Sequence, residues 1–88
     1  MIRENEKEII LNCAKRYHVH SIFIFGSSLR SAQYRDIDLA VEGVPANLFF
    51  RFYGDLIHEL PVPVDVIDLS KKSLFVDMVK AEGVKIYG

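Results

Sequence analysis

The sequence predicts a single small α/β (α+β) domain over residues 1–88, with helices flanking a mixed β-sheet. At 88 residues the chain has room for one hydrophobic core. Half of its residues are hydrophobic and 26% are charged, as in globular rather than disordered proteins. Short β-branched and aromatic runs alternate with segments of helical periodicity, which is typical of a sheet covered by helices.

The first half of the chain is expected to hold one long helix and one strand. Residues 2–18 show apolar side chains at helical spacing, with Glu6 among the charged residues of the other faces. Residues 21–25 form a β-branched and aromatic run that ends at Gly26, which predicts a buried strand. The polar segment 27–35 is interpreted as a loop that can open with a helical turn.

The second half should contain further strands at residues 36–41, 64–69 and 84–87. Residues 46–60 are predicted to be helical because apolar side chains follow the helical period and prolines come directly after them. Ser70 can cap another helix that runs to about Ala81. Three of its apolar side chains should point inward: Phe75, Met78 and Val79. Because no crossover helix joins the first two strands, mixed strand directions are expected.

Two aspartates share one face of the predicted strand 36–41. Strand alternation places Asp36 and Asp38 on the face opposite Ile37 and Leu39. Neighbouring carboxylates repel, and their pKa values rise unless a cation lies between them. Mg²⁺ is the natural cation, since it takes carboxylate, phosphate and water oxygens. On this pair alone, a solvent-facing strand without a function is the simpler interpretation.

Two further features point to a site. The strand 21–25 runs into Gly26, Ser27 and Ser28, where a glycine backbone, amides and hydroxyls can cradle an anion. This is not a P-loop, because the Gly-Lys-Ser/Thr ending is missing. Asp65 stands among valines in another strand, a conflict of pattern that is typical of functional sites. Asp68 should lie on the opposite face as a turn or helix-start residue.

The ordered motifs are Phe25-Gly26-Ser27, Asp36-Ile37-Asp38-Leu39-Ala40-Val41, Val64-Asp65-Val66-Ile67-Asp68-Leu69 and Glu82-Gly83-Val84-Lys85-Ile86-Tyr87. Over nearly the whole chain, this set resembles the DNA polymerase beta-type nucleotidyltransferase superfamily, above all its minimal nucleotidyltransferase (MNT) branch. The resemblance implies the polymerase beta-type fold. It also implies Mg²⁺-dependent transfer of a nucleoside monophosphate, AMP from ATP or its counterpart from another triphosphate, to a hydroxyl with release of pyrophosphate.

The resemblance also implies residue roles. Asp36 and Asp38 would bind the metals or the metal–triphosphate, and Asp65 would complete the catalytic metal site and help to activate the acceptor hydroxyl. Two Mg²⁺ ions are expected, with Mn²⁺ as the alternative. Gly26 and Ser27 would hold the triphosphate.

The phosphate side departs from the usual family pattern. The segment Ser28–Arg35 is shorter than is common, and Ser28 stands where the family usually has an arginine. Ser28 and Arg30 are the further nucleotide-binding candidates, since a guanidinium pairs well with phosphate. Arg35 is the weaker candidate. The alternative is that both arginines are solvated loop residues.

MNT-branch proteins resemble antitoxins that pair with a small all-helical HEPN-type ribonuclease toxin, and some adenylylate a tyrosine of that partner. A partner of this kind is therefore implied, with a homo-oligomer as an alternative. A net charge of −1 gives no strong nucleic-acid signal. One cysteine and no long apolar run fit a cytoplasmic protein without a membrane segment.

Two other functions stay open. The domain could be a catalytically inactive nucleotide-binding module that acts by binding its partner, or a metal-dependent phosphohydrolase that uses the same carboxylates. On the helix 46–60, Phe50, Tyr53 and Ile57 form a second apolar stripe that predicts an interface with another chain.

Overall fold

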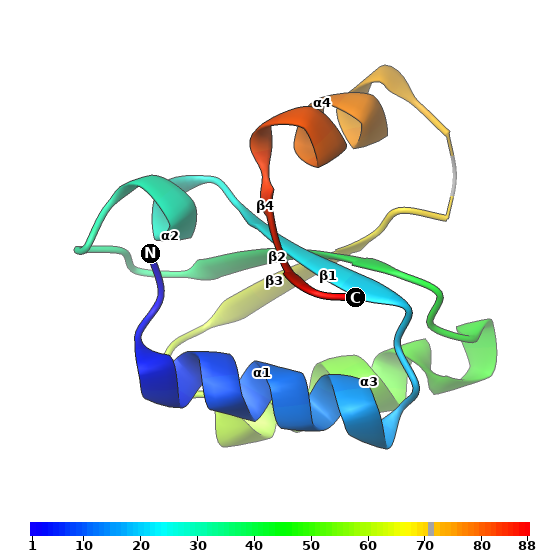
Figure 1. Ribbon diagram of the computed structural model, residues 1–88. Helices are drawn as coiled ribbons and strands as arrows, with labels where there is room; N and C mark the ends of the chain where they lie inside the picture. The colour runs from blue at the N-terminus through cyan, green and yellow to red at the C-terminus, as the bar shows by residue number, and fades with distance from the viewer. Residues whose placement is uncertain (71) are drawn as a thin grey trace.

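The computed structural model describes residues 1–70 and 72–88, and its elements alternate between helices and strands (Figure 1). In chain order they are α1 (Glu4–Arg16), β1 (Ser21–Phe25), α2 (Ser27–Arg30), β2 (Ile37–Glu42), α3 (Ala46–Glu59), β3 (Val64–Asp68), α4 (Leu74–Glu82) and β4 (Val84–Tyr87). All predicted helices and strands are present, and the helical turn expected after Gly26 is α2. Asp36 lies directly before β2 instead of starting it.

The strands form one mixed sheet in the order β3-β2-β1-β4. β1 runs antiparallel to both β2 and β4, whereas β2 and β3 are parallel. The strand directions follow from the connections, because a short segment joins β1 to β2 while α3 makes the crossover that a parallel pair requires. This confirms the predicted mixed α+β sheet with β4 at its edge.

The two faces of the sheet are covered unequally. α1 and α3 lie together on one face, while α4 lies on the other (Figure 1). The larger core cluster lies under α1 and α3 and includes Ile24, Leu39 and Phe52. The cluster under α4 contains only five buried residues: Phe23, Ala40, Leu69, Val76 and Val79. Part of the second sheet face is therefore left for polar side chains.

Polar contacts join α1 to α3 beside the large core. Arg16 lies 2.9 Å from both Asp55 and Glu59, and the Tyr17 hydroxyl donates to Asp55 at 2.6 Å. Cys13 is buried next to Glu59, and burial with that nearby carboxylate raises the pKa of its thiol to about 11. The thiol therefore stays protonated and packs as a small apolar group.

The start of α4 differs from the prediction. The cap is Ser73, whose hydroxyl accepts from the Val76 amide at 3.1 Å, and not Ser70. The Ser70 amide instead donates to Asp68 at 2.9 Å. Ser70 lies in the turn that Asp68 closes, and the later serine, Ser73, caps the helix. Asp68 is thus the predicted turn residue.

The buried side of α4 also differs from the prediction, which placed Phe75 and Met78 inward. Each is 48% exposed, whereas Val76 and Val79 are buried. A short helix that packs on Phe23 and Ala40 of the central strands buries only a narrow stripe at i and i+3. Of the three expected residues, only Val79 faces the core.

The second apolar stripe of α3 is only partly free. Phe50 is 82% exposed and Ile57 is 60% exposed, but the Tyr53 hydroxyl donates to the Val64 carbonyl at 3.2 Å and its ring is half-buried. That this stripe binds another chain stays a prediction. Within the described ranges, no helix is long and apolar enough to cross a membrane.

Two phenylalanines of α3 test the core directly. Phe52 is fully buried, so Phe52→Ala should lower the free energy of unfolding by about 3–5 kcal/mol in chemical denaturation. Phe50→Ala, on the exposed side of the same helix, should change it by no more than about 0.5 kcal/mol. Equal losses in the two variants would contradict this packing.

Candidate functional site

Two of the three predicted aspartates are direct neighbours in the sheet. Asp38 of β2 is paired with Asp65 of β3 in the parallel register. Ile37 and Leu39, on either side of Asp38, are fully buried in the large core. The two valines that flank Asp65 belong to the same core, with 8% exposure or less. Because side chains alternate along a strand, both carboxylates point to the opposite face, the one that carries α4.

Asp36 lies close enough to act on this pair. Burial raises the pKa of Asp38, and the charges of Asp65 and then Asp36 raise it further. Asp36 and Asp65 are both exposed, so water and ions reach the carboxylates. The site therefore carries a concentrated negative charge at one end of the sheet.

Oxygen donors of this kind suit Mg²⁺. In the described part of the chain, no three His, Cys, Asp or Glu side chains already converge as a metal-binding group. Mg²⁺ is usually held by only one or two carboxylates, and substrate phosphates and water supply its remaining ligands. Asp38 with Asp65 or Asp36 fits that pattern better than it fits a closed all-protein cage.

Gly26 lies against the carboxylate of Asp38. Its φ of +71° favours glycine, and a Cβ atom at this position would stand 2.5 Å from Asp38 Oδ2. The turn after β1 thus brings the backbone directly beside the acidic site. The predicted proximity of the Gly-Ser corner and the aspartates is present in the structure.

The two serines after Gly26 face different surroundings. Ser27 opens α2 and is exposed. Ser28 is fully buried, and its hydroxyl donates to the Phe25 carbonyl at 3.2 Å and accepts from the Asp38 amide at 3.1 Å. Its side chain does not face a ligand site, in contrast to the expectation of a nucleotide contact. It ties the end of β1 to the start of β2 instead.

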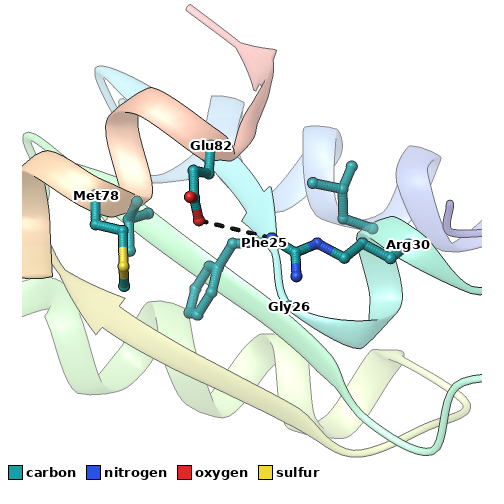
Figure 2. Close-up of a pocket in the computed structure, with 7 residues that line it drawn as sticks. Phe25, Gly26, Arg30, Met78 and Glu82 are labelled. Atoms are coloured by element: carbon teal, nitrogen blue, oxygen red, sulfur yellow. Dashed lines mark ion pairs between the residues drawn. The ribbon is translucent and has the colours of Figure 1, made fainter.

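A pocket of about 310 Å³ opens between α2 and α4. Its lining residues are Phe25, Gly26, Leu29, Arg30, Met78, Val79 and Glu82. Figure 2 shows Arg30 and Glu82 reaching toward each other beside Phe25, and the guanidinium Nη2 lies 3.6 Å from Glu82 Oε2. Arg30 therefore lines the pocket, whereas Arg35 is an exposed loop residue outside its lining, and the nucleotide contact of Arg30 stays a prediction.

Glu82 is a site residue that the sequence argument did not single out. The only signal was its place at the head of the motif Glu82–Tyr87, which had been used for recognition alone. Its carboxylate pairs with the Arg30 guanidinium, so it reduces the positive charge at this side of the pocket.

The raised pKa of Asp38 predicts a pH-dependent cost to stability. A carboxyl whose folded pKa lies above its unfolded value binds more protons in the native state, so stability falls as the pH rises from 3.8 through the folded pKa. Asp38→Asn should therefore raise the Tm by a few degrees at pH 7 without divalent ions, and the gain should disappear near pH 3.

Circular-dichroism melting curves at the two pH values measure this effect. Glu8→Gln, which removes one exposed carboxylate of α1, is the control and should leave the Tm nearly unchanged. A lower Tm for Asp38→Asn at pH 7 would contradict the repulsion among the carboxylates.

Solved structures of similar fold come from toxin–antitoxin complexes. A toxin–antitoxin solved with AMP-PNP matches with a TM-score of 0.76 and 24% identity over 93% of this chain and 73% of the other. A toxin–antitoxin MntA–HepT matches with a TM-score of 0.73 and 21% identity over 98% of this chain and 73% of the other. A tri-AMPylated HEPN toxin of Shewanella oneidensis in complex with its MNT antitoxin matches with a TM-score of 0.75 and 22% identity, over 99% and 73%.

At these identities the structural matches establish the fold. Among curated proteins, no match to the chain is found. The family model described as "Polymerase beta, Nucleotidyltransferase" matches residues 7–88, a range that includes the Gly-Ser corner and all three aspartates. The chain therefore belongs to the polymerase beta-type nucleotidyltransferase family.

Proposed function

We propose that the protein is a Mg²⁺-dependent nucleotidyltransferase that transfers AMP from ATP to a hydroxyl of a partner protein, as the MNT antitoxin of a HEPN/MNT pair. The observation that carries this proposal is the pairing of Asp38 with Asp65 beside the backbone of Gly26. Carboxylates for a metal and a glycine corner for phosphates meet there at one end of the sheet.

The reaction assigns each group a task. Asp36 and Asp38 hold the metal-bound triphosphate, and Gly26 lets its phosphates approach the backbone closely. The Mg²⁺ that these carboxylates would hold would supply positive charge to offset the negative charge of the phosphates. Asp65 takes the proton of the acceptor hydroxyl as its oxygen bonds to the α-phosphorus. The bond from that phosphorus to the bridging oxygen breaks, and pyrophosphate leaves.

The electrostatics of the site favour a cation. Three carboxylates share one end of the sheet, and their mutual repulsion is part of what raises the pKa of Asp38. A divalent ion that binds there relieves the repulsion among the carboxylates. This relief adds to the favourable free energy of metal binding.

The matched structures support the choice of nucleotide and acceptor. One was solved with AMP-PNP, and in another the HEPN toxin that accompanies an MNT antitoxin is tri-AMPylated. By analogy, the donor proposed here is ATP and the acceptor is a hydroxyl on a small all-helical HEPN-type protein. The alternative is a nucleotide-binding module that neutralises such a partner without turnover.

Labelled ATP, Mg²⁺ and the product of any adjacent gene for a small all-helical protein test the proposal. Label should move to the partner, and Asp65→Asn or the double change of Asp36 and Asp38 to Asn should slow transfer about 100-fold or more. Asp68→Asn is the matched control, since it removes a carboxylate of the same strand that points elsewhere. Transfer should persist in it.

Other outcomes identify the alternatives. Tight partner binding without label transfer by the unchanged protein would establish the inactive module. Hydrolysis of the labelled ATP without transfer of label to the partner would establish a phosphohydrolase. Persistence of transfer in the double variant would contradict the assignment of the aspartates.

The ion pair across the pocket predicts that Glu82 weakens nucleotide binding. Glu82→Gln frees Arg30 for the triphosphate and should tighten the binding of AMP-PNP with Mg²⁺ about two- to fivefold, the range expected for an exposed pair. Isothermal titration calorimetry at low salt measures the change. Asp77→Asn removes the same charge elsewhere on α4, and an equal gain in this control would attribute the effect to net charge.

A further inference from the structure

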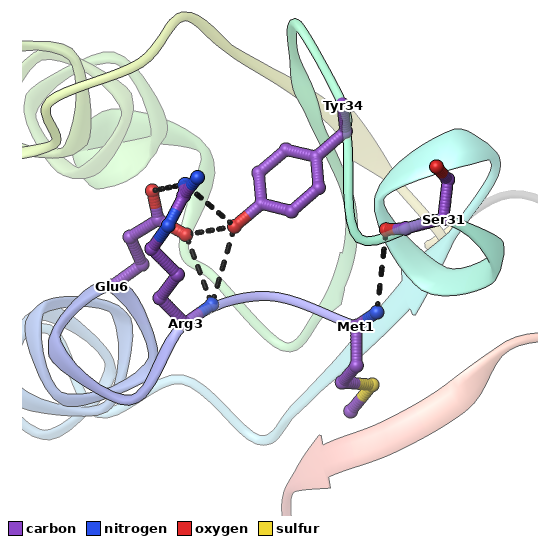
Figure 3. A network of polar contacts seen from close by, with 5 residues as sticks. All are labelled: Met1, Arg3, Glu6, Ser31 and Tyr34. Carbon is purple, nitrogen blue, oxygen red and sulfur yellow. Dashed lines mark hydrogen bonds and ion pairs between the residues drawn. The ribbon is translucent and has the colours of Figure 1, made fainter.

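A fully buried carboxylate lies at the start of α1. Glu6 is 0% exposed, although its position among charged residues predicted a surface location. Leaving such a group without partners is costly. Its oxygens accept from the Arg3 amide at 3.1 Å, from the Arg3 guanidinium at 3.4 Å and from the Tyr34 hydroxyl, in the network of Figure 3.

Tyr34 comes from a different part of the chain. It belongs to the segment between α2 and β2, and its hydroxyl also accepts from the Arg3 amide at 3.2 Å. The Arg3 guanidinium lies over the Tyr34 ring, 5.4 Å from its centre. Burial and the Glu6 carboxylate raise the pKa of Tyr34, so the hydroxyl keeps the proton that it donates.

A second contact holds the other end of the same segment. The N-terminal ammonium donates to the Ser31 carbonyl at 3.4 Å, and both Met1 and Ser31 lie next to the network in Figure 3. The segment 31–36 contains no helix or strand of its own. The Ser31 hydroxyl exchanges hydrogen bonds of 3.0 Å with the Gln33 amide and carbonyl, and the contacts with the N-terminal residues hold the segment to the rest of the fold.

Asp36 stands at the end of this segment, before the first residue of β2. On its carboxyl side, the Ile37 amide donates to the Pro63 carbonyl at 2.9 Å. On its amino side, the nearest residue with a side-chain anchor is Tyr34. We propose that Glu6 and Tyr34 are positioning residues that hold Asp36 at the acidic site through their partly buried hydrogen bond.

This inference rests on the proposed function, in which Asp36 takes part in metal binding. The predicted consequence is a loss of metal affinity when the hydroxyl is removed. Tyr34→Phe keeps the ring under the Arg3 guanidinium but removes the hydrogen bonds of the hydroxyl to Glu6 and Arg3, which frees the segment before Asp36. Loss of a group that orients a metal ligand typically weakens metal binding about 10-fold or more.

Mn²⁺ titration in the presence of AMP-PNP, followed by electron paramagnetic resonance, measures this affinity without requiring turnover. The titrations are done well below the Tm of each variant, so that all are folded. Tyr34→Phe should bind Mn²⁺ about 10-fold more weakly than the unchanged protein. Glu6→Gln, which keeps an acceptor oxygen for Tyr34, should retain most of the affinity.

Tyr17→Phe is the matched control, because it also removes a hydroxyl that donates to a carboxylate, on the α1–α3 side of the sheet. It should lower stability and leave Mn²⁺ affinity unchanged. In an Asp36→Asn background, Tyr34→Phe should have no further effect on affinity, since it acts through Asp36.

Equal affinities of Tyr34→Phe and the unchanged protein would overturn the inference. So would an equal loss in Tyr17→Phe, or a full further loss in the Asp36→Asn background. If the unchanged protein binds no Mn²⁺ with AMP-PNP, the proposed function itself fails, which is a different result from any of these.

Discussion

The contact between the Asp38 carboxylate and the backbone of Gly26 sets the geometry of the whole site. It exists because β1 and β2 pair antiparallel with Phe25 opposite Asp38, so that the end of one strand meets the start of the other. The turn after β1 must then be a glycine, since a Cβ would overlap the carboxylate. Ser28 fixes the same junction through its hydroxyl, which bridges the Phe25 carbonyl and the Asp38 amide.

Because helices cover the two faces of the sheet unequally, the junction of β1 and β2 is accessible from one face. α1 and α3 cover one face with the larger core, and the Arg16 and Tyr17 contacts with α3 hold that layer together. On the other face, α4 covers only a small cluster and leaves Asp38 and Asp65 beyond its reach. The larger core thus stabilises a fold whose second face bears like charges that repel. In a chain this short, the core on one face offsets the electrostatic repulsion at the acidic site on the other, so the domain stays folded.

What the sequence predicted well was local. Strand alternation placed Asp38 on the face opposite Ile37 and Leu39, and Asp68 on the face opposite Asp65, because the period of a strand does not depend on distant residues. The failures concern choices that distant groups decide. The cap of α4 is an exception, since the choice is local: Asp68 accepts from the Ser70 amide two residues on, and Ser73 is the cap. Ser28 looked like a ligand contact until the pairing of two strands gave its hydroxyl internal partners. Glu6 looked like a surface residue because nothing near it in the sequence reveals Tyr34.

The N-terminal helix α1 contacts both α3 and the segment before Asp36. Its last turn and C-cap hold α3 through Arg16 and Tyr17, and its first turn holds the segment before Asp36 through Glu6. The segment between α2 and β2 has no helix or strand and is held partly by hydrogen bonds between Ser31 and Gln33, so contacts from the N-terminal residues add to its order. A buried carboxylate suits this purpose, because leaving it unpaired costs more than an exposed bond would gain. The same penalty that makes Glu6 an unlikely core residue therefore makes it an effective anchor for the acidic site.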